Sequence, residues 1–390
     1  MKPQAFTHKL KSALLGWVIL GAAAFPASAQ APAQTPSEWR QIAATPVTIN
    51  GRMVTPSCSQ APGTTNPNYA FWFQQGTADG LVVFFQGGGA CWSDGTCSKP
   101  RLAGDHALFK GNEASSLYEA ELLPDVDPTG MTGLLDRSNP LNPVRDWSKI
   151  FLPYCTGDVH SGSNTANYRN PENGQAFTIQ HRGADNAQVV AHWMRANVPA
   201  PARLLVSGSS AGAYGSAGSY AALRELYPNA RAVYLGDAGM GVTTPEFESA
   251  RDASWNYQLP ASVFGPNAQR TPDAELIGRL AAFFPRDRFA QYTAIYDATQ
   301  RAFLGQMGGA KTCDTWTTRM LGELARRQAS PNFRSYVAEG EIHTILRSPL
   351  FFTQQSGGES FAQWVGKLIS DQAPENRICT NCQMAPGQCP

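Results

Sequence analysis

The sequence lacks any block of lysines and arginines, and its charge is almost balanced. Lys and Arg number 31 against 30 Asp and Glu, for a formal net charge of +1. A nucleic-acid-binding protein is expected to carry a basic patch or stripe, so the sequence indicates that nucleic acid is not the partner. The sequence also lacks the low content of hydrophobic residues that is typical of a disordered chain. Of its 390 residues, 42% are hydrophobic, which is ample for a packed core.

A long apolar run is missing as well. The N-terminal run from Ala13 to Ala24 holds about 12 residues, whereas a membrane-spanning helix needs about 20. Lysines precede this run and the small residues ASA follow it, ending at Ala29, which is typical of a cleavable signal peptide rather than of a membrane anchor. The sequence therefore predicts a signal peptide over residues 1–29, a linker over 30–50 and one folded domain over 51–390. We expect a secreted or periplasmic protein, cut after Ala29, with no membrane span.

The eight cysteines form an even set, which in an exported chain favours disulfides over free thiols. Spacing predicts one local bridge, Cys91 with Cys97, and leaves the other pairings open. The cluster CTNCQMAPGQC, which begins at Cys379, could alternatively bind zinc. It has no nearby fourth Cys or His, so we expect disulfides there too.

Apolar runs and helical patterns alternate along the chain, with no visible internal repeat. Strands are expected over residues 81–85, 149–158, 203–209, 231–239, 288–297 and 333–343. Helices are expected over residues 186–198 and 211–226. This alternation predicts an α/β fold whose mostly parallel central sheet has helices on both faces. The long connections at 111–142 and 243–272 are expected to be surface insertions that shape a cleft.

One serine stands in a frame that favours chemistry. Ser210 is the only serine of the chain in the frame G-x-S-x-G, between Gly208 and Gly212. The frame follows a predicted buried strand and opens a helix, so its small residues allow a sharp turn that exposes the hydroxyl group. A glycine-rich turn can carry serine without any chemistry, but this context favours a nucleophile.

Histidine is scarce, and this narrows the search for a base. A serine nucleophile needs a base, usually a histidine oriented by a carboxylate, and in this topology the order along the chain is Ser, Asp or Glu, His. Of the six histidines, only His343 follows Ser210. Asp237 and Asp297 both end predicted strands. Position favours Asp297 only modestly, so the choice of the acid stays open.

Acyl transfer also requires N–H donors for the negative charge that develops on the carbonyl oxygen. The backbone of Ala211, directly after Ser210, is one expected donor. The glycine run in QGGGA, after the strand at 81–85, is expected to supply the other, because bare backbone can approach a substrate closely. A disulfide between Cys91 and Cys97 would stiffen this loop.

An ordered set of motifs resembles the pectinacetylesterase and Notum family of secreted carboxylesterases, members of the α/β-hydrolase fold. The resemblance extends over roughly residues 54–350 and consists of the motifs FFQGGGACW, PYCTGDVHSG, HRGADN, SGSSAG, YDATQ and GEIHTIL. The resemblance implies that Ser210 is the nucleophile, His343 the base and Asp297 the acid. It implies that the oxyanion donors are Gly88, Gly89 and Ala211.

Two positions depart from many members of this family. Gly89 and Ala90 stand where relatives often carry a bulky aromatic residue. Ala238, in the motif DAG, stands where relatives often carry the serine of DSG. Both positions are expected near the acyl pocket, so the acyl group stays open.

These features together predict a secreted serine carboxylesterase that needs no metal or organic cofactor. The resemblance implies O-acetyl or other short acyl esters on pectin or a related polysaccharide as the substrate. A lipid or polyester acyl hydrolase of the same fold is an alternative, and so is a non-catalytic carbohydrate-binding relative, although the intact Ser, Asp, His order weighs against the latter. The oligomeric state stays open.

Two weaker hypotheses concern other residue types. A metal-dependent deacetylase would need clustered His and Asp ligands, for which Asp158 and His160 in GDVHSG are the only indication. Trp72, Trp92 and Trp255 are candidates for stacking on sugar rings, although tryptophan is more often packed inside a protein.

Overall fold

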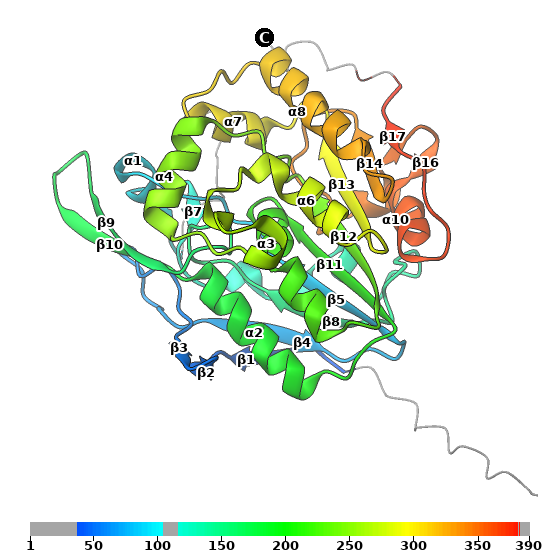
Figure 1. The fold of residues 1–390 in the computed structure, drawn as a ribbon, viewed down its shortest axis with the longest axis horizontal. Helices are drawn as coiled ribbons and strands as arrows, with labels where there is room; N and C mark the ends of the chain where they lie inside the picture. The colour runs from blue at the N-terminus through cyan, green and yellow to red at the C-terminus, as the bar shows by residue number, and fades with distance from the viewer. Residues whose placement is uncertain (1–36, 104–115, 381, 383–390) are drawn as a thin grey trace, which may run out of the picture. The chain divides into compact units, whose positions relative to one another are not determined.

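The central element of the fold is one large sheet, seen in a computed structural model that describes residues 37–103, 116–380 and 382. Within these residues, nine strands form this sheet (Figure 1). In spatial order they are β1 (Arg40–Ala43), β4 (Ala70–Gln74), β8 (Ser148–Leu152), β5 (Gly80–Phe85), β11 (Arg203–Ser209), β12 (Arg231–Asp237), β13 (Arg288–Ala294), β14 (Phe333–Ala338) and β17 (Arg377–Ile378). Only β4 runs against its neighbours, and the pairs from β8 to β17 are parallel. The predicted mostly parallel sheet is confirmed.

Helices cover both faces of the sheet. Successive residues of a strand point to opposite sides, so the two faces of one strand show which helices pack on each side. In β5, Leu81 and Val83 belong to one hydrophobic cluster, and Val82 and Phe84 belong to another. The first cluster includes residues of α2 (Gly183–Asn197), α3 (Ala211–Leu226), α6 (Leu276–Phe283) and α8 (Cys313–Gln328). The second includes residues of α9 (Leu350–Thr353) and α10 (Phe361–Ile369). Figure 1 shows α2 and α3 lying over the sheet.

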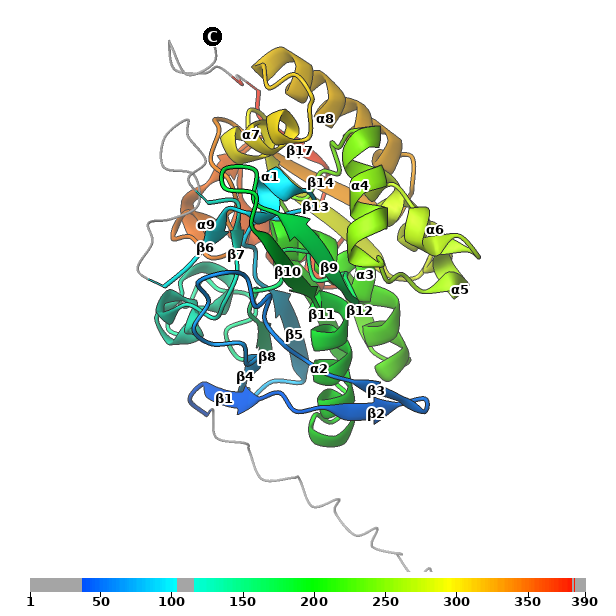
Figure 2. The ribbon, with the colours of Figure 1, turned by 90° about the vertical axis from the view of Figure 1, so that its left-hand side faces the viewer.

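Smaller elements surround this framework. Two-stranded pairs are β2 (Val47–Ile49) with β3 (Arg52–Val54), β6 (Pro100–Arg101) with β7 (Tyr118–Glu119), β9 (Asn164–Arg169) with β10 (Ala176–His181), and β15 (Gln355–Ser356) with β16 (Glu359–Ser360). The remaining helices are α1 (Asp94–Cys97), α4 (Pro245–Trp255), α5 (Ala261–Phe264) and α7 (Ala298–Gln306). Short 3-10 helices are η1 (Pro124–Val126), η2 (Pro128–Gly130), η3 (Gly133–Leu135), η4 (Ala268–Arg270) and η5 (Asp273–Glu275). The β9–β10 hairpin lies beside α4 (Figures 1 and 2).

The boundaries of several predicted elements are corrected by the structure. Residues 40–43, which fall in the predicted linker, form edge strand β1 and pair with β4. The strand expected over 149–158 ends at Leu152, because Pro153 has no N–H to donate to a neighbouring strand. The strand expected over 333–343 ends at Ala338, and β17 follows it in the sheet. The predicted signal peptide lies outside the described residues.

Disulfides connect both neighbouring and distant segments of the domain. The predicted bridge between Cys91 and Cys97 is confirmed, and two further bridges join Cys58 with Cys155 and Cys379 with Cys382. Cys313 is also disulfide-bonded. The bridge at Cys379 uses two of the three thiols that could have bound zinc, and Cys389, the third, lies outside the described residues. In the described part of the chain, no helix is long and apolar enough to cross a membrane.

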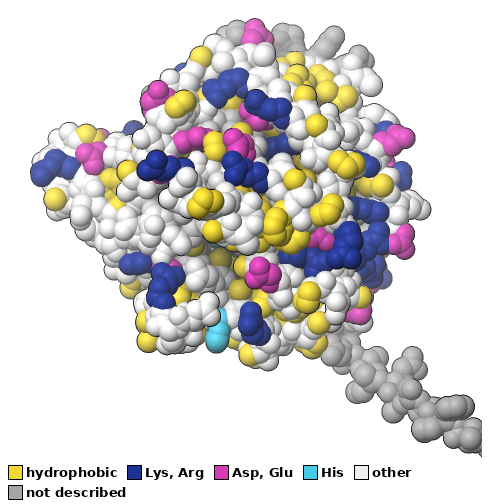
Figure 3. All heavy atoms as spheres, viewed as in Figure 1, with side chains coloured by type: hydrophobic (Ala, Val, Ile, Leu, Met, Phe, Trp, Pro, Cys, Tyr) yellow, Lys and Arg dark blue, Asp and Glu magenta, His cyan; other side chains and the backbone are white. Residues whose placement is uncertain are grey.

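Charged side chains of both signs share the surface, and Figure 3 shows them scattered among uncharged ones on the face that it draws. Two arginines stand at the amino ends of parallel strands, where they hold the segment after α10. Arg231 pairs with Asp371, and Arg288 donates to the carbonyl oxygens of Leu368 and Ser370 at 2.9 and 2.6 Å. These arginines therefore have structural partners.

Candidate active site

The residues singled out from the sequence meet at the carboxyl ends of the parallel strands. Gly88 and Gly89 follow β5, Ser210 follows β11, Asp297 follows β13 and His343 follows β14. In open α/β sheets, ligands bind outside this edge. The fold therefore brings together residues that are more than 250 positions apart in the sequence.

Ser210 lies at the turn between β11 and α3 in a strained backbone conformation. Its φ is 55° and its ψ is −123°, a region that residues other than glycine rarely adopt. The N–H of Ser210 donates to the carbonyl oxygen of Asp237 at 2.7 Å. A Cβ on Gly212 would lie 2.0 Å from the carbonyl oxygen of Phe85, and one on Gly208 would lie 2.2 Å from that of Gly212. Both glycines of the frame are therefore needed for the helix and the strands to approach each other.

The other serines around Ser210 have structural hydrogen bonds. Ser207 donates to the carbonyl of Leu235, Ser209 to the carboxylate of Asp237 and Ser216 to the carbonyl of Ala213. All three are buried. Ser210 is partly exposed, and within the described residues its hydroxyl takes part in no hydrogen bond. Its hydroxyl is therefore available to a substrate.

His343 is oriented by a buried carboxylate. Its Nδ1 lies 2.8 Å from Oδ2 and 3.0 Å from Oδ1 of Asp297, which is fully buried. Asp297 also caps α7, accepting hydrogen bonds from the N–H of Gln300 at 2.8 Å and from its Nε2 at 2.9 Å. Nε2 of His343 has no hydrogen-bond partner among the described residues. The imidazole thus has one nitrogen fixed and the other free to exchange a proton.

Asp237, the second candidate for the acid, contacts the loop of His343 rather than its imidazole. Its Oδ2 accepts from the hydroxyl of Ser209 at 2.7 Å and from the N–H groups of Ile345 and Leu346 at 2.9 Å each. The structure therefore pairs His343 with Asp297 and gives Asp237 a role in holding the surrounding backbone.

The charges around His343 favour its protonated form. Burial alone would lower the pKa of His343, but the charge and hydrogen bond of Asp297 raise it above its usual value, with a further contribution from the charge of Asp237. An imidazolium formed by taking a proton from a serine would be stabilised in the same way.

The backbone N–H groups near Ser210 that are without an acceptor in the described part of the chain include those of Gly88, Gly89 and Ala211. The segment from Gly88 to Ala90, called the glycine strip below, is held on its other side by two backbone hydrogen bonds. The N–H of Ala90 donates to the carbonyl oxygen of Leu117, and the N–H of Glu119 donates to that of Gly88. Gly89 has φ +75°, and a Cβ there would lie 1.9 Å from the carbonyl oxygen of Leu117. Only glycine allows this approach.

Two hollows meet at Ser210 and His343. The first, of about 60 Å³, is mainly apolar. Its lining residues are Gly89, Ala90, Val159, Ser210, Ala211, Tyr214, Ala238, Val242, Thr243, Phe247, Asp273, Gln300, Phe303, Met307 and His343. The second, of about 170 Å³, is more polar and includes Glu119, Thr299 and Arg347. Gly89, Ala90 and Ala238, which the family resemblance led us to expect near the acyl pocket, all line the apolar hollow.

The predicted insertions contribute to these hollows. Thr243 and Phe247, from the connection at 243–272, line the apolar one, and Glu119, from the connection at 111–142, lines the polar one. Gln300 and Tyr214 were not predicted from the sequence. Gln300 carries a weak signal, the polar residue three positions after a helix-capping aspartate, whereas Tyr214 carries none beyond its place one turn after Ser210.

The residues behind the two weaker hypotheses have structural roles. Trp72, Trp92 and Trp255 are at least 94% buried, so they are not surfaces for stacking on sugars. The carboxylate of Asp158 accepts from the hydroxyl of Thr156 and from the N–H of Gly183. Nε2 of His160 lies 2.8 Å from the carbonyl oxygen of Gln86. These groups are engaged with the protein.

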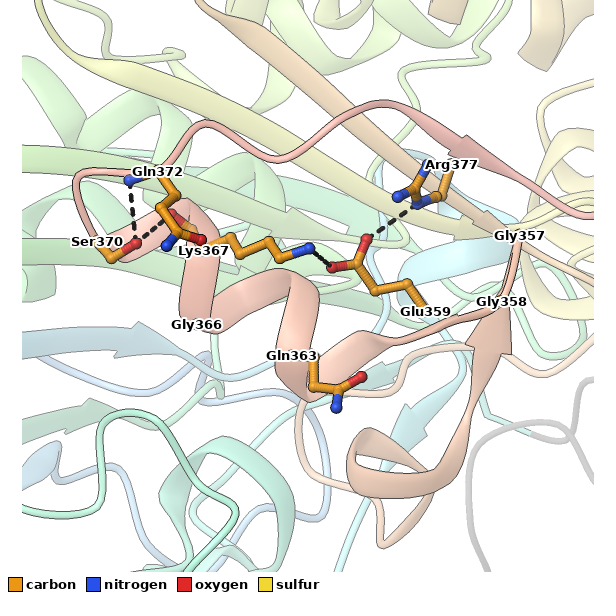
Figure 4. Close-up of a pocket in the computed structure, with 9 residues that line it drawn as sticks. All are labelled: Gly357, Gly358, Glu359, Gln363, Gly366, Lys367, Ser370, Gln372 and Arg377. Carbon is orange, nitrogen blue, oxygen red and sulfur yellow. Dashed lines mark hydrogen bonds and ion pairs between the residues drawn. The ribbon is translucent and has the colours of Figure 1, made fainter.

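A larger hollow, of about 560 Å³, lies around α10 and β16 (Figure 4). Its charged groups pair with one another, since Glu359 lies 2.6 Å from Lys367 and 2.9 Å from Arg377. Its one serine among the described lining residues, Ser370, donates its hydroxyl to the carbonyl oxygen of Lys367 at 2.9 Å, and no histidine or aromatic side chain stands beside it there. The volume of this hollow exceeds that of the two hollows at Ser210, but among these residues it brings no histidine base to a serine.

Comparison with known proteins identifies the family. A family model described as Pectinacetylesterase matches residues 64–293, and a comparison with curated proteins finds no match. The matched segment contains the glycine strip and Ser210, whereas Asp297 and His343 follow its end. Because the match covers more than half of the 390 residues, the chain belongs to the pectinacetylesterase family, whose members are α/β hydrolases.

Proposed function

We propose that this protein is an exported serine carboxylesterase that removes acetyl and similarly short acyl groups, with Ser210, His343 and Asp297 as its catalytic triad. Membership of the pectinacetylesterase family supports an acetylesterase-type hydrolase. The observation that carries the proposal is His343, whose Nδ1 is held by Asp297 while its Nε2 is free beside hollows shared with Ser210.

The reaction follows from these positions. Nε2 of His343 takes the hydroxyl proton of Ser210 while Oγ attacks the ester carbonyl, and the oxyanion is stabilised by backbone N–H groups of Ala211 and of Gly88 or Gly89. The imidazolium then gives the proton to the leaving alcohol as the acyl–oxygen bond breaks. Water, deprotonated in turn by His343, attacks the acyl-enzyme, and the acid leaves as Ser210 recovers its proton.

The two hollows suggest how an ester would lie. The apolar hollow of about 60 Å³ suits a short acyl group. The polar hollow, with Glu119, Thr299 and Arg347, suits the hydroxyl groups of a sugar that carries the ester, because precisely placed polar groups orient such ligands. Pectin or a related O-acetylated polysaccharide is therefore the proposed substrate.

The deciding experiment compares Ser210→Ala with Ser219→Ala, which replaces a partly exposed serine in the helix that follows Ser210. On p-nitrophenyl acetate, Ser210→Ala is expected to lower kcat by about 10⁶-fold, with an unchanged circular dichroism spectrum, and Ser219→Ala is expected to keep normal turnover. Substantial activity in Ser210→Ala would refute the mechanism. Loss of wild-type activity on chelation would instead favour a metal-dependent deacetylase.

A substrate panel then tests the choice of acyl group. Acetyl release from acetylated pectin is expected to exceed hydrolysis of esters with long alkyl chains, which do not fit the small apolar hollow. The reverse order would identify a lipid hydrolase of the same fold.

A further inference from the structure

The apolar hollow beside Ser210 contains one buried carboxylate. Asp273 lines this hollow and is 3% exposed, although it lies 63 positions after Ser210 in the sequence. A buried charge is costly unless the protein or a ligand compensates it. An acetyl group needs no such group in its pocket, so Asp273 points to a ligand that makes a further polar contact.

Among the described residues, the hydrogen-bond donors to the side chain of Asp273 all meet one of its two oxygens. Oδ1 accepts a hydrogen bond from Nη1 of Arg251 at 2.7 Å and one from the hydroxyl of Tyr257 at 3.0 Å. Oδ2 accepts none from the described residues. A carboxylate oxygen can accept more than one hydrogen bond, so Asp273 retains acceptor capacity for a ligand.

The charge around Asp273 is not fully neutralised by its partner. Arg251 is completely buried and also binds Asp252, with Nη2 at 2.8 Å from Oδ1, so one guanidinium is shared by two carboxylates. Burial raises the pKa of Asp273, against the opposing charge of Arg251. A neutral hydrogen-bond donor from a ligand would stabilise the ionised carboxylate.

A tyrosine in the same hollow completes this polar end. Tyr214 also lines the hollow, and its hydroxyl oxygen accepts from the N–H of Gly241 at 3.0 Å. The hydroxyl hydrogen of Tyr214 has no acceptor among the described residues. The hollow thus offers an acceptor on Asp273 and a donor on Tyr214, the pair that a hydroxyl group can satisfy at once.

Ser210 lines the same hollow as Asp273 and Tyr214, so an acyl chain bound to Ser210 would extend toward them. A hydroxyl on the second carbon of that chain would stay beside the carbonyl group and its oxyanion donors, whereas a hydroxyl on the third carbon is the first that can stand clear of them. The third carbon is therefore the position that we assign to the hydroxyl.

We propose that this pocket selects short acyl groups that carry a hydroxyl on the third carbon, with Asp273 accepting a hydrogen bond from that hydroxyl and Tyr214 donating one to it. The inference rests on the proposed function and refines it. Asp273 and Tyr214 are then specificity residues, and esters of 3-hydroxybutyrate, whether small or polymeric, are the class of substrate that they recognise.

The test is a ratio of kcat/KM values measured on one enzyme by titrating the released acid. Ethyl (R)- and (S)-3-hydroxybutyrate are each compared with ethyl butyrate, after correction for their rates of alkaline hydrolysis. One enantiomer is expected to exceed butyrate by about 10- to 100-fold, the range for a hydrogen bond to a charged group. A ratio of one or less for both enantiomers overturns the proposal.

Variants locate the effect. Tyr214→Phe and Asp273→Asn are each expected to reduce the ratio at least several-fold, and Tyr227→Phe, at the other end of α3, is the matched control in which the ratio stays the same. If Asp273→Asn does not fold because Arg251 loses its partner, Tyr214→Phe and the wild-type ratio still decide. An unchanged ratio in Tyr214→Phe, as expected if only water occupies this end, contradicts the proposal.

The outcomes also separate this inference from the proposed function. If the wild-type protein hydrolyses neither acetate, butyrate nor 3-hydroxybutyrate esters, the esterase proposal itself fails. If it hydrolyses acetate and butyrate esters and disfavours both hydroxy esters, only the role of Asp273 and Tyr214 fails.

Discussion

The carboxylate of Asp237 accepts a hydrogen bond from the N–H of Ile345 over 2.9 Å and so holds the loop that carries His343 without bonding its imidazole. The donors to Asp237 all meet a single oxygen, Oδ2, whose place the amide oxygen of asparagine can take. Asp297 differs, because both of its oxygens accept hydrogen bonds from Gln300 and His343. An asparagine at position 297 would replace one of these oxygens with an NH₂ group, which would then face a donor of Gln300 or His343 instead of accepting from it.

The same substitution is therefore expected to have different effects at these two aspartates. Asp297→Asn should lower kcat on p-nitrophenyl acetate by about 10⁴-fold, the order seen when the acid of a serine triad becomes an amide. Asp237→Asn should lower it by less than about 10-fold, because the loop of His343 keeps its hydrogen bonds. Each variant serves as the other's control. The opposite ranking would mean that Asp237 is the acid.

The pH dependence of activity should report on His343. Its pKa is raised by Asp297 and Asp237, and only the neutral imidazole can accept the proton of Ser210. We expect kcat/KM for an activated ester to rise with pH along a limb whose midpoint lies above the ordinary histidine pKa of about 6.5. In Asp297→Asn the midpoint of any residual activity should move down, because the largest raising influence is gone. A wild-type midpoint below 6.5 would contradict this role of the two aspartates.

Much of the site was accessible from the sequence because it depends on local rules. The elbow around Ser210 needs Gly208 and Gly212, and this need is visible as a frame. His343 was found because only one histidine follows Ser210. Asp297 could not be separated from Asp237 by position alone, since both end strands; the family resemblance made the choice, and the three-dimensional pairing with His343 agrees with it.

What the sequence did not reveal depends on contacts between distant segments. Asp273 reaches the hollow because the chain from α4 onward packs near Ser210, where Phe247 and Tyr257 share a hydrophobic cluster with Ala211. Nothing local marks Asp273 as part of a pocket. Residues 40–43 are too short a stretch to show a clear strand pattern, yet they pair with β4. The buried Trp255 illustrates the same limit, since its Nε1 bonds the carbonyl of Cys91 164 positions away.

The closeness of α3 to β5 predicts a specific sensitivity at Gly212. A Cβ at this position would lie 2.0 Å from the carbonyl oxygen of Phe85 and 2.7 Å from that of Gln86, so backbone must shift. Gly212→Ala is expected to reduce the free energy of unfolding by about 1–3 kcal/mol and to lower kcat, because Ser210 and the glycine strip move apart.

The control for Gly212→Ala is Gly278→Ala in α6, where a Cβ meets nothing within 4 Å. Alanine is the better helix former by up to about 1 kcal/mol, so Gly278→Ala should keep or increase stability and leave kcat unchanged. Denaturant unfolding and turnover of p-nitrophenyl acetate measure both effects. Full activity and stability in Gly212→Ala would show that the helix can move away from β5 without cost.

Removing each of two disulfides should affect the protein differently, one mainly its stability and the other mainly its activity. Cys58 and Cys155 are 97 positions apart, whereas Cys91 and Cys97 are 6 apart and directly follow the strip of Gly88 to Ala90. In the chain-entropy model the longer loop stabilises the protein by about 5 kcal/mol and the shorter one by about 2 kcal/mol. Replacing Cys58 and Cys155 by serine should therefore destabilise the protein more.

Replacing Cys91 and Cys97 by serine should instead act mainly on turnover, because the backbone next to Ser210 loses its brace. We expect kcat for p-nitrophenyl acetate to fall by about 10-fold or more, since small displacements of positioning groups are costly in catalysis. Both double variants are compared by denaturant unfolding and by kcat at a temperature where each is folded. If the variant lacking the 91–97 bridge keeps full kcat, the glycine strip is held by its hydrogen bonds to Leu117 and Glu119 alone.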